Sequence, residues 1–139
     1  MTKPSEEDIG LIFRTFISDF VLKDKQDRLK QFFEKEKNWW KLKNEFHTSS
    51  CFDLKKLVDI KPSDQYADQI YIKMKVLGAT ENCVSLLDYL GNSEYQFDLN
   101  LKLKDCVGFL IETILYCPKT KLGYFEGGHA KDRYILKFN

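Results

Sequence analysis

Hydrophobic residues near the start of the chain recur every three or four positions, which is typical of one buried face of an α-helix. They are Ile9, Ile12, Phe13, Phe16, Ile17 and Phe20. Ser5 precedes them as a suitable N-cap, and the acidic residues 6–8 suit the positive end of a helix dipole. The pattern predicts a first helix that ends near Val21 or Leu22.

A second helical region is expected to begin near Asp24. Its apolar positions form two groups, one over Leu29–Phe33 and one over Trp39–Phe46. The two groups differ in helical phase, so we expect either one bent helix or two short helices. Residues 51–62 include several apolar residues, but their spacing fits neither a helix nor a strand.

A further helix is predicted to start at Ser63. Apolar residues over 66–77 fit one helical face, and Gly78 stands where a helix C-cap favours a left-handed residue. A strand is the alternative interpretation, because apolar and polar residues also alternate over 70–76. The helix is preferred because it has both a start signal and a stop signal.

From residue 82 onward the pattern favours β-structure. The segments with strand-like composition or alternation are 83–87, 95–99, 109–117, 122–125 and 134–138. Residues 100–107 fit either a short helix or the end of a strand. The last three segments are separated by turn residues, so they predict a three-stranded antiparallel meander.

These elements predict an α+β fold, with N-terminal helices packed on one face of a mostly antiparallel sheet that ends in the meander. The chain has 139 residues, the size of one ordinary domain. We expect a single domain over 1–139, helical over 5–77 and mainly β over 82–138.

Composition and charge narrow the functional classes. The chain is 43% hydrophobic and carries a net charge of +1, so it has material for a core but no overall attraction for nucleic acid or anionic membranes. No stretch approaches the roughly 20 apolar residues of a membrane span. The acidic N-terminus does not resemble a signal peptide. A cytoplasmic location is therefore expected.

Cysteine and glycine patterns suggest no cofactor. The four cysteines lie in apolar runs and are expected to be buried free thiols. Neither they nor the two histidines have the spacing of a metal site, and no metal or cofactor is predicted. Gly127-Gly128 is interpreted as a turn rather than a phosphate-binding loop.

The same turn carries the strongest candidate for catalysis. Glu126, His129 and Lys131 lie within six positions of one another, and such groups can serve acid–base cleavage of RNA. The competing interpretation is a solvated polar turn, which we favour. No second histidine lies nearby in the sequence to act as the partner acid, although His47 could approach in space.

The segment from Lys23 to Lys43 combines basic and aromatic residues. It could bind nucleic acid, or it could be a helix with lysines in water and aromatic residues in the core. Trp39 and Trp40 are neighbours, about 100° apart on a helix, so one of them should be partly exposed. An exposed tryptophan often anchors a protein partner. The predicted partner-binding residues are Trp39, Trp40, Lys37 and Lys41.

The C-terminal half resembles small uncharacterised bacterial proteins over roughly residues 64–137. The similar segments are Gly78-Ala79, Cys83-Val84-Ser85, Tyr116-Cys117-Pro118, residues 122–127 and Arg133-Tyr134-Ile135-Leu136. The resemblance implies a bacterial, cytosolic origin and carries no activity with it.

The sequence thus predicts a non-catalytic protein-binding module, by elimination an immunity- or antitoxin-type inhibitor of a bacterial toxin. Such proteins need a stable core and a complementary surface but no cofactor. The alternative is a small RNA-directed nuclease or toxin that uses His129. The third possibility is an accessory protein that binds nucleic acid through residues 23–43. The oligomeric state is left open.

Overall fold

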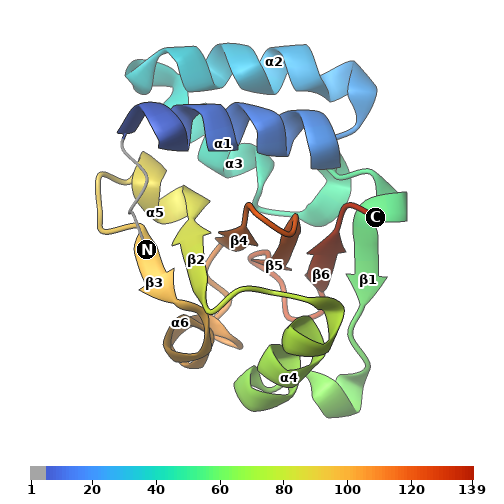
Figure 1. Cartoon of the computed structure of the whole chain (residues 1–139). Coiled ribbons are helices and arrows are strands. Elements are labelled where there is room, and N and C mark those ends of the chain that lie inside the picture. Colours follow the sequence, from blue (N-terminus) through green and yellow to red (C-terminus); the bar gives the residue numbers. More distant parts are fainter. Residues whose placement is uncertain (1–5) are drawn as a thin grey trace.

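The computed structural model describes residues 6–139, so the predicted cap at Ser5 lies outside the described residues. Its α-helices are α1 Glu6–Phe20, α2 Lys23–Glu34, α3 Trp39–Glu45, α4 Ala67–Leu77, α5 Leu86–Leu90 and α6 Leu99–Cys106 (Figure 1). Short 3₁₀ turns stand at Glu36–Asn38, Ser49–Cys51, Leu54–Lys56 and Pro62–Asp64.

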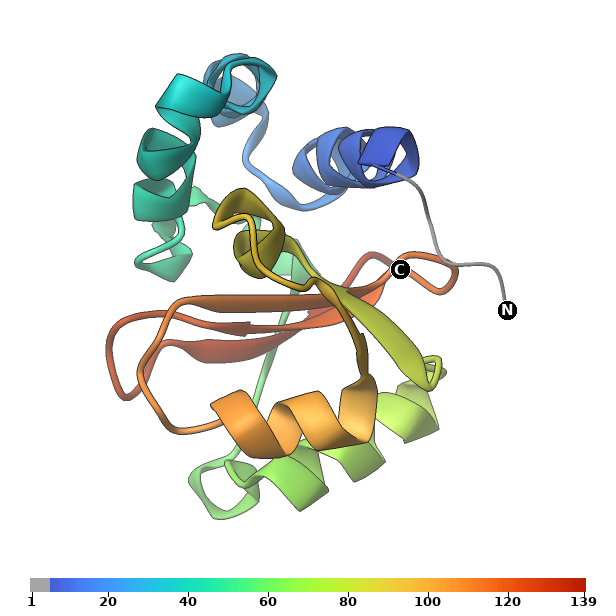
Figure 2. The same ribbon diagram turned by 90° about the vertical axis from the view of Figure 1, so that its left-hand side faces the viewer.

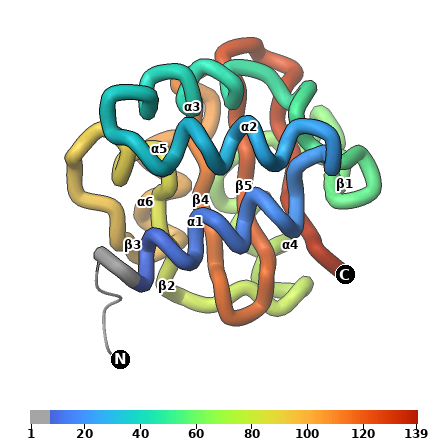
Figure 3. The backbone as a smooth tube through the Cα atoms, turned by 90° about the horizontal axis from the view of Figure 1, so that it is seen from above, coloured from blue at the N-terminus to red at the C-terminus, as the bar shows by residue number. Residues whose placement is uncertain are grey.

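The strands form one six-stranded sheet in the order β1-β6-β5-β4-β2-β3, and every described pairing is antiparallel. Their bounds are β1 Leu57–Asp59, β2 Asn82–Ser85, β3 Gln96–Asp98, β4 Thr113–Cys117, β5 Leu122–Glu126 and β6 Arg133–Lys137. The predicted α+β class and the C-terminal β4-β5-β6 meander are confirmed. Seen from above, α1 and α2 run across the meander strands (Figure 3).

Helices cover both faces of the sheet, whereas the sequence suggested one. α1, α2, α3 and α5 lie on one face, and α4 and α6 lie on the other (Figure 2). Residues of β4 alternate between the two cores. Ile114 and Tyr116 join the first core, while Leu115 and Cys117 join the second. A strand buried on both faces reads as a continuous apolar run, which explains the composition of this segment.

The boundaries of several elements differ from the sequence predictions. The region from Asp24 to Phe46 forms two helices, α2 and α3, which is one of the two expected outcomes. Residues 99–106 are helical, because the Asp98 carboxylate caps α6 by accepting a hydrogen bond from the Leu101 amide at 3.0 Å. β4 begins at Thr113, so residues 109–112 are not part of the predicted strand.

The four cysteines are buried free thiols, as predicted. Burial raises the pKa of Cys51 and of Cys106 to about 12, which keeps both thiols protonated at neutral pH. Over residues 6–139, no helix is long and apolar enough to cross a membrane.

Candidate functional site

Three loops meet at one end of the sheet. They are residues 46–53 after α3, residues 107–112 between α6 and β4, and residues 127–132 between β5 and β6. The antiparallel register aligns Thr113, Glu126 and Arg133 across the neighbouring strands β4, β5 and β6, which places the last two loops side by side. Figure 2 shows the end of α3 above both of them at the left of the view.

Two histidines from different loops come together at this end. The rings of His47 and His129 are in edge-to-face contact, with 5.1 Å between centroids and 71° between planes. His47 Nδ1 lies 2.9 Å from Glu112 Oε1. The side chains of His47 and Glu112 are 45% and 35% exposed, so both groups are accessible to a ligand. We refer to His47 and His129 as the histidine pair.

The two glycines of the β5–β6 turn permit this approach. The Gly128 amide donates a 2.8 Å hydrogen bond to the His47 carbonyl. A Cβ atom at Gly128 would stand 2.1 Å from His47 Cε1, and one at Gly127 would stand 2.7 Å from the His47 carbonyl oxygen. Neither glycine has a left-handed φ. The glycine pair therefore serves close packing of residue 47 against the turn, which sequence reasoning missed.

The pKa of Glu112 is lowered, chiefly because His47 donates a hydrogen bond to its carboxylate. A carboxyl group whose pKa is lowered by folding adds stability at neutral pH that is lost as the pH falls through the folded pKa. We predict that His47→Ala raises the Glu112 pKa toward the ordinary value of about 4.3. A carbon-detected NMR titration of the Glu112 carboxyl measures this. An unchanged pKa would show that the hydrogen bond is not formed in solution.

The loop before β4 exposes three consecutive apolar side chains. Phe109, Leu110 and Ile111 are 61%, 42% and 64% exposed. Gly108 and Leu110 both have positive φ values, of 90° and 58°. A leucine in the left-handed region is unusual and persists only where surrounding contacts impose it. We call residues 108–111 the apolar loop.

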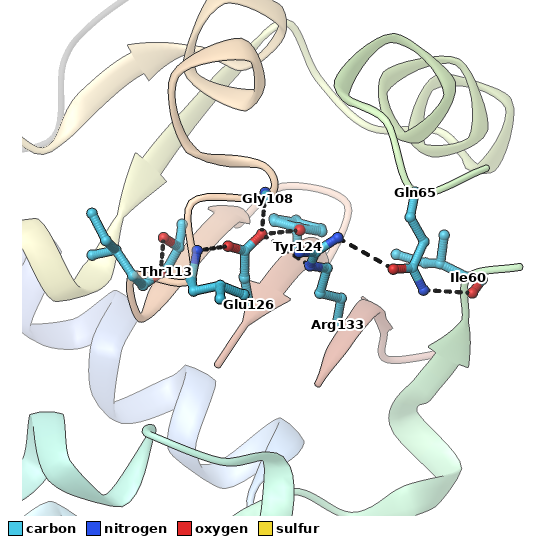
Figure 4. Close-up of polar contacts among 9 residues, drawn as sticks. Ile60, Gln65, Gly108, Thr113, Tyr124, Glu126 and Arg133 are labelled. Atoms are coloured by element: carbon cyan, nitrogen blue, oxygen red, sulfur yellow. Dashed lines mark hydrogen bonds and ion pairs between the residues drawn. The ribbon is translucent and has the colours of Figure 1, made fainter. Parts of the chain in front are cut away.

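Glu126 imposes this conformation from inside the protein (Figure 4). Its fully buried carboxylate accepts hydrogen bonds from the amides of Gly108, at 2.9 Å, and Leu110, at 2.7 Å. The Tyr124 hydroxyl donates a third, at 2.6 Å, and burial, together with this bond, raises the pKa of Tyr124. Arg133 Nε lies 3.4 Å from the same carboxylate and forms an ion pair without a hydrogen bond. Arg133 also donates to Gln65 Oε1 at 3.2 Å.

Glu126 therefore plays a different part from the one its sequence position suggested. It is the last residue of β5 rather than a turn residue, and its side chain is enclosed. His129 and Lys131 lie in the exposed turn beyond it. The structure replaces Glu126 with Glu112 as the carboxylate beside the histidines, a partner that lies 65 residues from His47 in the sequence.

The adjacent tryptophans differ in exposure, as predicted. Trp40 is 65% exposed, and Lys41 lies 5.7 Å from the centre of its ring. Trp39 is half-buried, stacks on Phe33 at 5.9 Å, and donates its indole hydrogen to the Phe33 carbonyl. Lys37 is exposed. Of the predicted partner-binding residues, Trp39 thus belongs largely to the core.

The exposed side of α3 leads toward the apolar loop. Trp40, Lys43 and His47 are spaced by three and four residues, which places them along one side of the helix and its extension. The positive charge of Lys43 helps to lower the pKa of Glu112. Glu112 also lines a shallow pocket of about 180 Å³ whose wall includes Phe109 and Ile111.

This end of the molecule combines the apolar loop, which includes the exposed Phe109, with two accessible histidines. Over residues 6–139, no group of three or more histidine, cysteine or acidic side chains is arranged to hold a metal ion. Comparison with protein-family models, curated proteins and solved structures found no match for this chain.

Proposed function

We propose that the chain is a protein-binding module of the immunity or antitoxin type, whose partner docks on the apolar loop and the exposed side of α3. The observation that carries this proposal is the apolar loop itself. Three neighbouring apolar side chains point away from the core, and a buried carboxylate holds their backbone. Isolated exposed apolar residues are common, but a fixed contiguous group is typical of an interaction site.

Rigidity makes such a loop suited to binding. A partner that binds a flexible segment must first order it, and this ordering lowers the affinity. Here the hydrogen bonds to Gly108 and Leu110 are already formed within the folded protein. An aromatic residue such as Phe109 or Trp40 at the centre of an interface supplies much of the binding energy.

Charge on α3 indicates the chemistry of the partner. Three exposed lysines lie close to Trp40 in the sequence: Lys41 and Lys43 on α3, and Lys37 in the 3₁₀ turn just before it. A complementary surface would present carboxylates around an apolar depression, since opposite charges guide association and fix its orientation. The proposed partner is therefore a protein with an acidic rim and an apolar pocket.

Affinity purification with paired variants tests this proposal. The wild-type chain, the variant Phe109→Ser/Ile111→Ser and a control Ile72→Ser/Val76→Ser serve as baits in an extract of the native host. Ile72 and Val76 are also exposed apolar residues, but they lie on α4, which packs on the face of the sheet opposite α3 and is outside the proposed binding surface. We expect mass spectrometry to find one protein retained by the wild type and the control, with about 30-fold less on the loop variant, the effect of losing a binding hot spot.

Two results would overturn the proposal. One is equal capture of the same protein by the loop variant, which would place the contact elsewhere. The other is recovery of nucleic acid alone, which would favour the accessory role of residues 23–43. Circular dichroism of all three baits checks that the substitutions leave the fold unchanged.

A further inference from the structure

We propose that the histidine pair, with Glu112, is an acid–base site that cleaves RNA by transferring the phosphodiester to its own 2′-hydroxyl. This goes beyond the proposed function, because it assigns a catalytic activity to the chain in addition to partner binding. It rests on the geometry of His47, His129 and Glu112 and does not use the apolar loop. The docking of a partner on the apolar loop does not depend on this chemistry.

His47 has the arrangement of a general base. The ionised Glu112 carboxylate can only accept a hydrogen bond, so Nδ1 of His47 must carry the hydrogen of the 2.9 Å contact. Nε2 is then left with a lone pair for a substrate proton. A carboxylate that fixes the tautomer and orientation of a histidine is a recurring part of hydrolytic and transfer enzymes.

His129 is placed to act as the general acid. It lies in the exposed turn, and its ring centroid is 5.1 Å from that of His47. Both side chains are accessible at the same place on the surface, so a phosphodiester bound against them can present its attacking oxygen to one ring and its leaving oxygen to the other. The loops that carry the two residues are held together by the bond between the Gly128 amide and the His47 carbonyl, so their mutual position is fixed.

The two histidines account for both proton transfers that the reaction requires. His47 Nε2 takes the proton of the ribose 2′-hydroxyl as the bond from O2′ to phosphorus forms. The bond from phosphorus to O5′ breaks, and protonated His129 gives its proton to O5′. The products are a 2′,3′-cyclic phosphate and a 5′-hydroxyl end. Proton exchange with water restores both histidines, and DNA is excluded because it lacks the 2′-hydroxyl.

Charged groups around the pair suit a phosphate substrate. Glu112 and Asp132 are the nearby carboxylates, but Asp132 accepts a hydrogen bond from the Ser49 amide at 2.8 Å, and Glu112 is paired with His47. Lys43 lies close enough to Glu112 to lower its pKa, and Lys131 is exposed two residues after His129. The ammonium group of Lys43 can stabilise the charge that develops on the phosphate.

A cleavage assay on the purified full chain tests the proposal. The substrate is a fluorescently labelled single-stranded RNA oligonucleotide in excess EDTA, with DNA of the same sequence alongside. We expect cleavage of the RNA only, products with cyclic phosphate ends, and a rate that falls at both low and high pH, as it does when one group must accept a proton and another must donate one. His47→Asn and His129→Asn should each lower the rate by at least about 100-fold.

Matched variants distinguish cleavage by this chain from cleavage by a co-purified nuclease and from loss of activity through misfolding. Lys104→Ala removes an exposed lysine from α6 and should keep the wild-type rate after the same purification. Glu112→Gln should leave some activity but shift the pH profile, because Glu112 acts by positioning His47. Circular dichroism verifies the fold of every variant.

The proposal fails if the wild type leaves the RNA intact, or if His47→Asn and His129→Asn keep its rate. Such a failure would leave loop-dependent capture of a partner unaffected. Conversely, cleavage that depends on both histidines would stand even if no protein were captured through the apolar loop.

Discussion

Replacing Glu126 with glutamine is expected to lower the free energy of unfolding by about 3–5 kcal/mol, the cost of breaking a buried ion pair. The carboxylate of Glu126 is fully buried and satisfies three hydrogen-bond donors as well as the charge of Arg133. A glutamine side chain fills the same volume, but it carries no charge and places an amide nitrogen where one oxygen accepts. Chemical denaturation of both proteins measures the difference.

Glu112→Gln is the matched control for this substitution. It makes the same chemical change at a carboxylate that is 35% exposed, where an ion pair contributes at most about 1 kcal/mol. If Glu126→Gln proved as mild as the control, the buried ion pair and the loop contacts would have no role in stability.

A second variant separates the ion pair from the support of the apolar loop. Glu126→Leu combined with Arg133→Met removes both charges, and apolar replacement of a buried pair is often close to neutral. The amides of Gly108 and Leu110 would still lose their acceptor. We expect this double variant to recover part of the stability while hydrogen exchange at those two amides becomes faster than in the wild type.

The sequence predicts the parts of the fold that depend on local pattern. α1 was predictable because its apolar residues repeat with helical spacing, and the meander because apolar strands alternate with turn residues. α6 was ambiguous because Leu99, Leu101 and Leu103 stand at alternate positions, which suits a strand. In the helix, Leu99 and Leu103 are buried and Leu101 is 62% exposed. The capping role of Asp98 was the available signal for this helix.

The candidate site depends on contacts that no local pattern reveals. His47 and His129 are far apart in the chain, and the bond that aligns them joins the main chain of two loops. The apolar composition of residues 109–111 favours a strand, but the Glu126 carboxylate binds the amide of Leu110, which has a left-handed φ of 58°. A single acidic residue at the end of a predicted strand gives no sign that it will be buried and support another loop.

Gly128→Ala is expected to destabilise the protein by about 1 kcal/mol, at the lower end of the cost of overpacking, because the group that must move is a half-exposed side chain. The added methyl group would stand 2.1 Å from Cε1 and 2.6 Å from Nδ1 of His47, so the imidazole ring must leave its position. That movement would also break the contact with Glu112 and separate the histidine pair. Thermal or chemical unfolding measures the loss, and NMR of the His47 ring reports the displacement.

Removing the obstructing ring should rescue this variant. In Gly128→Ala/His47→Ala the methyl group enters the space that the imidazole left, so the two substitutions should be coupled by about 1 kcal/mol. Gly127→Ala is the control, because its methyl group would meet the His47 carbonyl oxygen at 2.7 Å, and that atom remains after His47→Ala. Equal rescue at both glycines would mean that the ring of His47 does not pack on Gly128. Rescue at Gly128 alone would establish that the turn is shaped to receive the ring, which is the arrangement that positions the histidine pair.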